Sequence, residues 1–260
     1  MVTGPPDAAT ALDRLATDWE RMSERYLAGR SALIGDAVRV VTGSVSGERP
    51  LVVDLGSGPG TVLDRVVAAL PDARAVAIEP DPVLAAVHRL RSSRSGALPR
   101  QCPLDLAVAT WSGAVAALGP VDVVLAVQVL HYLPEDRCRE LLAEVRALLA
   151  PRGVLVHLDT VPAGDRRESD GDRRESTGER ADHDLPAASG DDAWTAWWRR
   201  AAVVPALASA FARRGPVPPP SAEFHPDQAR LDALLAGAGL ARRVARHRHG
   251  RSLLTVVGAR

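Results

Sequence analysis

The 260-residue sequence predicts an α/β fold with a seven-stranded, mostly parallel sheet and helices on both of its faces. Short apolar runs such as "LVVDL" (residues 51–55) and "VDVVLAV" (residues 121–127) alternate with longer amphipathic stretches from residue 51 onward. Strands that are apolar on both faces and joined by helices are typical of parallel sheets covered on both sides. Two closing strands joined by a "GR" turn predict a hairpin, which gives the sheet an antiparallel C-terminal edge.

The spacing of the apolar residues places each element along the chain. The expected strands lie at residues 51–55, 74–79, 121–127, 153–159, 241–249 and 252–259, with a further, poorly marked strand near "PRQCPL" at 99–104. The expected helices lie at residues 59–70, 82–91, 135–149 and 226–238, after two amphipathic helices within 7–46 and before the hairpin. The expected strands and helices thus alternate along the chain, as a parallel α/β sheet requires.

Composition divides the chain into five segments. We expect an N-terminal helical cap at residues 1–46, a ligand-binding core at 47–160, a mobile low-complexity loop at 161–192, a helical lid at 193–225, and a closing helix and hairpin at 226–260. The loop contains "GDRRES" twice in tandem and has too few apolar residues to offset its ordering entropy. A surface insertion that arose by local duplication explains it better than a binding motif.

Charge and cysteine content exclude several classes of protein. Acidic and basic residues balance at 32 each, so no global electrostatic footprint of a nucleic-acid-binding protein is present. The sequence has no lysine, which excludes Schiff-base chemistry and a P-loop. Cys102 and Cys138 stand far apart and indicate neither a disulfide framework nor a metal site. With no leader-like or membrane-length apolar segment, we expect a cytoplasmic monomer or homodimer without a membrane partner.

The stretch "LVVDLGSGPG" combines a strand, an aspartate and three alternate glycines at residues 51–60. Glycines at the end of a strand allow a ligand to approach the backbone directly, and a following helix directs its amide groups toward the ligand. A dinucleotide loop has the pattern G-x-G-x-x-G, whereas the sixth position here is Thr61. The loop therefore favours a different nucleotide-like ligand over NAD.

The form "DLGSGPG" closely resembles the first motif of class I S-adenosylmethionine-dependent methyltransferases, which have a Rossmann-like fold. The segments "AIEPDP", "PLDLA", "VDVVLAVQVLHYLP" and "LLAPRGVLVHLD" follow in the order of that family's later motifs, so the resemblance covers about residues 50–160. It implies that Asp54 lies near the methionine amine, that Glu79 accepts hydrogen bonds from both ribose hydroxyls, and that Asp105 meets the adenine amino group. It further implies an S-adenosylmethionine site that comprises Asp54, Gly56, Ser57, Gly58, Gly60, Glu79, Pro80, Asp105, Leu106, Val127 and Gln128, with Tyr26 and Arg30 closing over it from the N-terminal helices.

Two histidines are candidate catalytic bases. His131 follows the fourth strand, near the point where the transferred methyl group should emerge, and an imidazole titrates near neutral pH. Similar positions in relatives also serve as packing elements, and His225, which precedes a helix, is a second candidate base. His157 and Asp159 end the fifth strand at the edge that binds ligands in open parallel sheets, although satisfied core groups explain them as well.

Trp194, Trp197 and Trp198 lie at i, i+3 and i+4 and share one helical face. Such a stripe is equally consistent with core packing and with the wall of an apolar substrate pocket.

The function expected from these features is methyl transfer from S-adenosylmethionine (EC 2.1.1.-) to an oxygen, nitrogen or carbon of a small molecule. The arginine-only, alanine-rich composition is typical of a high-GC bacterium, where methyltransferases of secondary metabolites are common, and we expect a secondary metabolite as acceptor. A tRNA methyltransferase is a second possibility, given the arginines near residues 242–251. A non-catalytic, S-adenosylmethionine-binding regulatory protein is a third. We expect no metal and no nucleic-acid partner.

Overall fold

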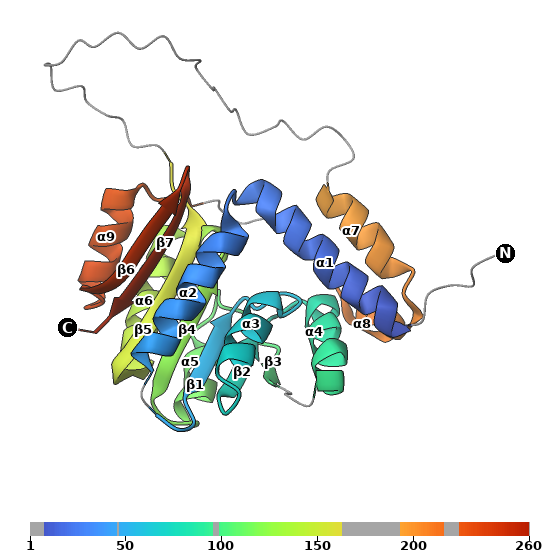
Figure 1. Ribbon diagram of the computed structural model, residues 1–260, viewed down its shortest axis with the longest axis horizontal. Helices are drawn as coiled ribbons and strands as arrows, with labels where there is room; N and C mark the ends of the chain where they lie inside the picture. Colours follow the sequence, from blue (N-terminus) through green and yellow to red (C-terminus); the bar gives the residue numbers. More distant parts are fainter. Residues whose placement is uncertain (1–7, 46, 96–98, 163–192, 216–223, 260) are drawn as a thin grey trace, which may run out of the picture.

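The computed structural model describes residues 8–45, 47–95, 99–162, 193–215 and 224–259 (Figure 1). The strands are β1 (Leu51–Leu55), β2 (Arg74–Ile78), β3 (Arg100–Cys102), β4 (Val121–Val127), β5 (Leu149–Thr160), β6 (Arg242–His249) and β7 (Ser252–Gly258). The α-helices are α1 (Ala8–Tyr26), α2 (Arg30–Ser44), α3 (Thr61–Ala69), α4 (Pro82–Ser95), α5 (Thr110–Ala116), α6 (Glu135–Leu148), α7 (Ala193–Ala202), α8 (Ala208–Arg213) and α9 (Gln228–Gly237). Two short 3₁₀ turns, η1 (Leu130–Tyr132) and η2 (Pro205–Leu207), complete the described elements.

The strands form one seven-stranded sheet in the order β3-β2-β1-β4-β5-β7-β6. The first five strands of this order run parallel, while β7 pairs antiparallel with both β5 and β6. The predicted mostly parallel sheet with its antiparallel C-terminal hairpin is thus confirmed. The chain reverses its direction of winding between β1 and β4, and open α/β sheets bind ligands at the carboxyl ends of the strands at such a point.

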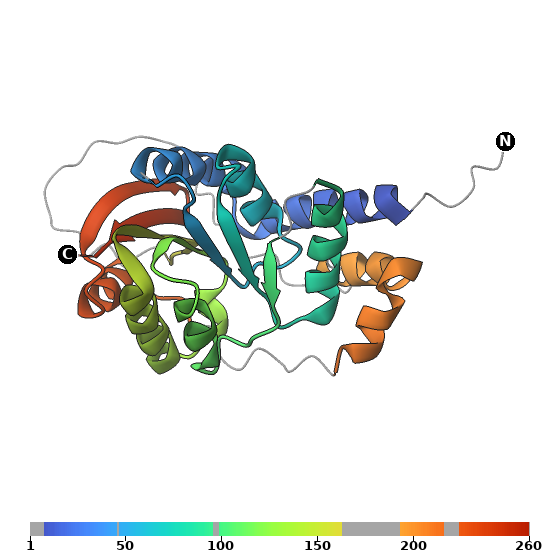
Figure 2. The ribbon, with the colours of Figure 1, turned by 90° about the horizontal axis from the view of Figure 1, so that it is seen from below.

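Helices cover both faces of the sheet (Figure 2). On one face α2 and α3 pack against the sheet around Ile34 and Val66. On the other face α5, α6 and α9 enclose a core that includes Trp111 and Leu141. The strands are apolar toward both layers, which explains the uninterrupted "LVVDL" and "VDVVLAV" runs.

A separate group of helices lies beyond the β3 side of the sheet, where α1, α4, α7 and α8 share a third apolar cluster (Figures 1 and 2). Leu12 and Leu15 of α1, Val87 of α4 and Trp197 of α7 are buried together there. This arrangement brings the N-terminal cap and the predicted lid into contact, although about 170 residues separate them in the sequence.

Several element boundaries differ from those predicted. Helix α3 begins at Thr61 rather than at residue 59, because Gly60 has a left-handed backbone with φ 83° and serves as the N-cap. Strand β5 begins at Leu149, and α4 continues to Ser95. The short helices α5 and α8 were not predicted, because each presents too few turns for a clear helical period. The weak third strand does form, as β3, while residues 163–192 of the loop predicted at 161–192 lie outside the described residues.

Candidate cofactor and acceptor site

The glycine loop at residues 56–60 joins β1 to α3 at the carboxyl edge of the sheet. Its three glycines all have positive φ, with values of 63° at Gly56, 55° at Gly58 and 83° at Gly60. A Cβ atom at Gly56 would overlap the side chain of Val129, and one at Gly60 would overlap the ring of His88. These glycines were predicted to expose backbone to a ligand. At Gly56 and Gly60, however, the missing Cβ makes room for a protein side chain.

At Gly58, a Cβ atom would lie 3.3 Å from the ring of Trp19 in α1. The N-terminal cap therefore contacts the central glycine of the loop directly. Sequence periodicity placed Trp19 only among the apolar residues of an amphipathic helix, and no local pattern links residue 19 to residue 58.

Asp54 and Ser57 flank the start of the loop as buried polar side chains. One carboxylate oxygen of Asp54 (Oδ2) and the hydroxyl of Ser57 have no hydrogen-bond partner among the described residues. Burial, together with the nearby Glu79 carboxylate, raises the pKa of Asp54 well above its ordinary value. A buried carboxylate in this condition is stabilised by a cation or a hydrogen-bond donor brought by a ligand.

Glu79 follows β2 and turns its carboxylate into the glycine loop. Its Oε2 accepts a hydrogen bond from the Gly58 amide at 2.8 Å, and its Oε1 accepts one from the Asp81 amide at 2.9 Å. Burial raises the pKa of Glu79 to about 7, although these two backbone hydrogen bonds oppose the shift. Each carboxylate oxygen keeps a further acceptor position, so Glu79 can also bind a pair of ligand hydroxyl groups.

Arg30 and Gln128 meet at the carboxyl end of β4. The Nε atom of Arg30 donates to Oε1 of Gln128 at 2.9 Å, while its Nη1 atom donates to both carboxylate oxygens of Glu20 at 2.7 Å. Glu20 in turn accepts a short hydrogen bond from the hydroxyl of Thr61. Gln128 is the one described non-glycine residue with positive φ, at 55°, and such strained backbone is concentrated at functional sites.

This network joins α1, α2, α3 and β4 around the entrance to the glycine loop. Arg30 and Gln128 were predicted as residues of the cofactor site, whereas Glu20 and Thr61 were not. Glu20 lies among charged residues on a helix surface, and the fold alone brings it to the loop.

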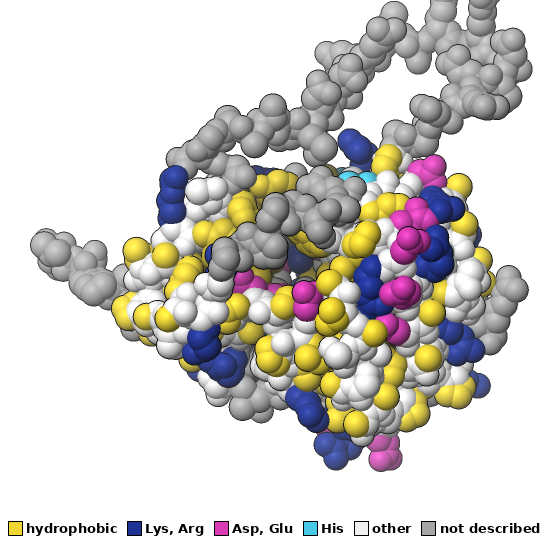
Figure 3. All heavy atoms as spheres, turned by 180° about the vertical axis from the view of Figure 1, so that it is seen from behind, with side chains coloured by type: hydrophobic (Ala, Val, Ile, Leu, Met, Phe, Trp, Pro, Cys, Tyr) yellow, Lys and Arg dark blue, Asp and Glu magenta, His cyan; other side chains and the backbone are white. Residues whose placement is uncertain are grey.

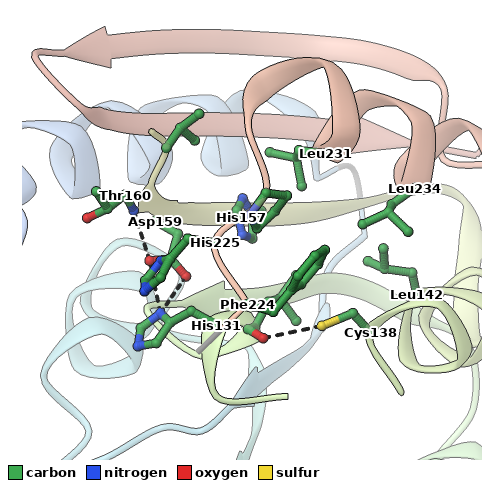
Figure 4. Close-up of a pocket in the computed structure, with 13 residues that line it drawn as sticks. His131, Cys138, Leu142, His157, Asp159, Thr160, Phe224, His225, Leu231 and Leu234 are labelled. Carbon is green, nitrogen blue, oxygen red and sulfur yellow. Dashed lines mark hydrogen bonds and ion pairs between the residues drawn. The ribbon is translucent and has the colours of Figure 1, made fainter. Parts of the chain in front are cut away.

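His131 and Asp159 form a hydrogen-bonded pair at the ends of β4 and β5 (Figure 4). The Nδ1 atom of His131 lies 2.8 Å from Oδ2 and 3.0 Å from Oδ1 of Asp159. Although burial opposes it, the hydrogen bond from His131 lowers the pKa of Asp159, so the carboxylate is ionised. The ring of His225 stacks on that of His131, with centroids 5.2 Å apart. Both predicted base candidates are therefore adjacent.

A small cavity lies between this pair, α6 and α9 (Figure 4). Its wall is largely apolar, with polar groups from His131, His157, Asp159, Thr160 and His225. His157 is buried, and burial lowers its pKa, so the ring is neutral. Its Nδ1 atom has no hydrogen-bond partner among the described residues. Phe224 and Cys138 also line the cavity, although neither was predicted as a site residue. Burial raises the pKa of the Cys138 thiol to about 12.

The tryptophans lie elsewhere. Trp197 is fully buried in the cluster of α1, α4, α7 and α8, and its indole donates to the carbonyl of Leu15 at 2.8 Å. Trp198 packs against both Trp197 and Trp194, and Trp19 packs against Trp194 and Trp197. None of the three predicted tryptophans lines the cavity beside His131. The structure thus corrects the pocket interpretation for Trp197, which is a core residue of the lid.

The remaining predicted positions are peripheral to these groups. Pro80 and Asp105 are exposed, and Asp105 accepts a hydrogen bond from the Ala107 amide at 2.8 Å. Leu106 is buried and its carbonyl accepts from Arg137, while Val127 ends β4 directly before Gln128. Tyr26, at the end of α1, is 48% exposed. Within the described ranges, no cluster of acidic, histidine or cysteine side chains could hold a metal ion.

Sheet order, glycine loop and the acid after the second strand together define the methyltransferase type of Rossmann-like fold. Residues 53–155 match the family model described as a methyltransferase domain. Over this segment, which is less than half of the chain, the protein is similar to the class I S-adenosylmethionine-dependent methyltransferases, and it shares their fold.

Two curated relatives are similar to part of the chain. Trans-aconitate 2-methyltransferase of Methylobacterium radiotolerans is 35% identical over 105 residues, and that of an Azoarcus species is 36% identical over 104 residues. Each alignment covers 40% of this chain and 36% of the relative. The chain thus matches little more than a third of the length of these relatives.

Solved structures extend the likeness to nearly the whole chain at the level of fold. An O-methyltransferase family protein from Burkholderia thailandensis has a TM-score of 0.53 at 19% identity, covering 97% of this chain and 71% of that one. A putative O-methyltransferase from Nostoc punctiforme has a TM-score of 0.54 at 14% identity, covering 98% and 62% respectively. At this level of identity the likeness concerns the fold alone.

The residues of the site fit the cofactor that this family implies. Asp54 is a buried carboxylate with an unpartnered oxygen, which suits the ammonium group of a methionine moiety. Glu79, 21 residues from the Gly58 amide that it binds, has acceptor positions left for ribose hydroxyls. The carboxyl edge of β1 and β2 thus provides acceptors where S-adenosylmethionine has donors.

Proposed function

We propose that this protein catalyses methyl transfer from S-adenosylmethionine to an oxygen, nitrogen or carbon atom of a small molecule, and that this acceptor is a secondary metabolite. The observation that carries the proposal is the placement of two buried carboxylates, Asp54 and Glu79, beside the glycine loop at the carboxyl edge. Neither carboxylate has an ion pair with a basic side chain among the described residues, so both suit a ligand rich in donors.

In this proposal the cofactor supplies an electrophilic methyl group on a sulfonium. The chain binds and orients it: Asp54 accepts from the methionine amine, Glu79 accepts from the ribose, and Gln128, held by Arg30, borders the methionine end. Positioning of this kind accounts for a large part of the rate enhancement of a bimolecular transfer.

His131 is proposed as the base that removes a proton from the acceptor. Asp159 fixes the tautomer of His131 by binding Nδ1, which leaves Nε2 to accept that proton. His225, stacked on the same ring, is the second candidate base.

A base is useful only if the acceptor carries a proton that must be lost. A carboxylate such as trans-aconitate, the compound named for the two relatives, is ionised at neutral pH and needs no base. The pair of His131 and Asp159 therefore favours a hydroxyl, amine or acidic carbon as acceptor over a carboxylate.

The arrangement of charges supports a small molecule over tRNA. Arg246, on β6, binds both carboxylate oxygens of Asp232, and Arg243 lies 3.7 Å from the same residue. On the face shown in Figure 3, basic and acidic side chains are intermixed and no extended basic patch appears.

No described helix is long and apolar enough to cross a membrane.

Calorimetry with S-adenosylhomocysteine and with NAD tests cofactor choice, and methyl release to a panel of hydroxylated, aminated and carboxylated small molecules tests catalysis. We expect binding of the first ligand only. Glu79→Ala should weaken that binding at least tenfold, because each hydrogen bond to a charged acceptor contributes about 1.5 to 3 kcal/mol. Binding of NAD without a response to S-adenosylhomocysteine would contradict the proposal, and cofactor binding without any turnover would favour a regulatory protein.

A further inference from the structure

The lid is connected to the acid of the cofactor site by a chain of short polar contacts. Arg214, directly after α8, places its Nε atom 2.6 Å from Oδ2 of Asp81. The amide of Asp81 donates to Glu79, and the other oxygen of Glu79 accepts from Gly58. Asp81 and Glu79 thus connect the guanidinium of Arg214 in the lid with Gly58 of the glycine loop.

The ion pair at the centre of this chain is sheltered. The side chains of Arg214 and Asp81 are each only 19% exposed, and the guanidinium carbon lies 3.7 Å from the ring centroid of Trp198. Stacking on an aromatic ring and a partly desolvated partner hold an arginine in one orientation better than an exposed pair does.

The same acid also organises the next helix. Oδ1 of Asp81 accepts from the amides of Val83 and Leu84 at 2.8 and 3.1 Å, which caps the start of α4. Asp81 therefore has one oxygen committed to α4 and the other to Arg214, so its backbone amide is fixed in the position that binds Glu79.

We propose that Arg214 is a positioning residue of the cofactor site. By holding Asp81, it sets the orientation and the charge state of Glu79, the residue that receives the ribose. This inference rests on the proposed function, since it assigns Glu79 to the cofactor. Arg214 itself touches neither Glu79 nor the glycine loop, and it acts through Asp81 alone.

The charges around Glu79 give this role a measurable signature. Glu79 faces the carboxylates of Asp54 from β1 and Asp81 from its own loop, and Arg214 is the cation beyond Asp81. The negative charge of Asp81 favours the protonated form of Glu79, and Arg214 offsets that charge. Loss of Arg214 should therefore raise the pKa of Glu79, and loss of the charge on Asp81 should lower it.

The test is the pH dependence of S-adenosylhomocysteine binding to the full-length chain, measured by calorimetry between about pH 6 and pH 9. In Arg214→Gln we expect affinity to fall about three- to tenfold near pH 6.5 and to recover near pH 9, where Glu79 ionises in either protein. Arg214→Lys keeps the charge and should restore most of the wild-type profile. Arg213→Gln, at the exposed last residue of α8 directly before Arg214, is the matched control and should leave the profile unchanged.

Asp81→Asn provides a second, opposite test, because asparagine can still cap α4 while it removes the charge. The midpoint of its binding profile should move to lower pH, and this variant tests the inference even if Arg214→Gln fails to fold. A loss of affinity that is the same at every pH, or an unchanged profile in both variants, would overturn the role of Arg214. If the wild-type chain does not bind S-adenosylhomocysteine, the proposed function itself fails, and the inference fails with it.

Discussion

His131 and Asp159 are joined by a hydrogen bond of 2.8 Å between the imidazole Nδ1 and the carboxylate Oδ2, across the carboxyl ends of two adjacent parallel strands. The residues belong to η1 and β5, and 28 positions separate them in the sequence. Pairing through Nδ1 leaves the other ring nitrogen of His131 turned away from Asp159, as a base acting on an acceptor requires.

Replacement of the proposed base, His131, should slow methyl transfer without changing cofactor affinity. His131→Gln is expected to lower kcat about 10²- to 10⁴-fold, the range for loss of a general base. Asp159→Asn should lower kcat by less, because the ring remains but its tautomer is no longer fixed. The affinity for S-adenosylhomocysteine, measured by calorimetry, should stay within about twofold of wild type in both. Unchanged turnover in His131→Gln would assign the base role to His225 or to no residue.

The stability of the ligand-free protein should fall as the pH rises through neutrality. Glu79 has an ordinary pKa of 4.5 and a folded pKa of about 7. Between these values the folded state binds a proton that the unfolded state has lost, so the free energy of unfolding decreases as pH rises through this window. The contribution of Glu79 is about 3 kcal/mol, and Asp54, with its raised pKa, acts in the same direction.

Urea denaturation at intervals between about pH 5 and pH 8 measures this slope. Glu79→Gln cannot titrate and should flatten it, whereas Glu48→Gln, at an exposed position before β1, should not. Equal slopes in the wild type and Glu79→Gln would show that Glu79 is not the group responsible.

Trp197 should behave as a core residue. Its indole is fully buried and hydrogen-bonded, so Trp197→Ala should cost about 3 to 5 kcal/mol of unfolding free energy, measured by chemical denaturation. Trp194→Ala, at a 36% exposed position of the same helix, should cost clearly less. A small loss of stability in Trp197→Ala, accompanied by a raised KM for an acceptor, would restore the pocket interpretation.

The glycines of the loop should differ from a glycine in a helix. Gly60→Ala introduces a Cβ into the ring of His88 at a position with φ 83°, and we expect a loss of at least about 2 kcal/mol. Gly113 is exposed within α5 and has no atom within 4 Å of a Cβ placed on it. Gly113→Ala should therefore stabilise the protein by about 0.5 to 1 kcal/mol.

A double-mutant cycle separates the two causes of strain at Gly60. Combining Gly60→Ala with His88→Ala removes the overlap but not the left-handed backbone, so the coupling energy should be about 1 kcal/mol or more. Additive losses would indicate that the backbone conformation alone requires glycine at this position.

The sequence was sufficient to predict features that depend on neighbours in the chain. Strands that are apolar on both faces, the glycine loop after β1, the acid near the end of β1 and the acid after β2 all appear where the local pattern placed them. Because parallel strands end at one edge of a sheet, His131 and Asp159 were each expected at the ligand-binding edge, but the hydrogen bond between them was not predicted.

Features that depend on the packing of distant helices could not be predicted. Glu20 reaches Thr61, Trp19 covers Gly58 and Arg214 holds Asp81 only because α1, α7 and α8 dock beside the sheet. In the sequence these residues are an ordinary acid, an ordinary apolar residue and one of many arginines. The tryptophan stripe illustrates the same limit, since helical spacing identifies the shared face but not the neighbour that covers it.

The position of β7 between β5 and β6 has a consequence for the rate of folding. All seven residue pairs between β5 and β7 join distant parts of the chain, from Thr160 with Ser252 to Val154 with Gly258. Closing so long a loop costs entropy before the paired strands gain any hydrogen bonds or buried surface. We therefore expect the five parallel strands to form early in refolding, with insertion of the hairpin as the slow step. Until then β5 is an open edge, and the partly folded chain is most prone to associate with another copy through that strand.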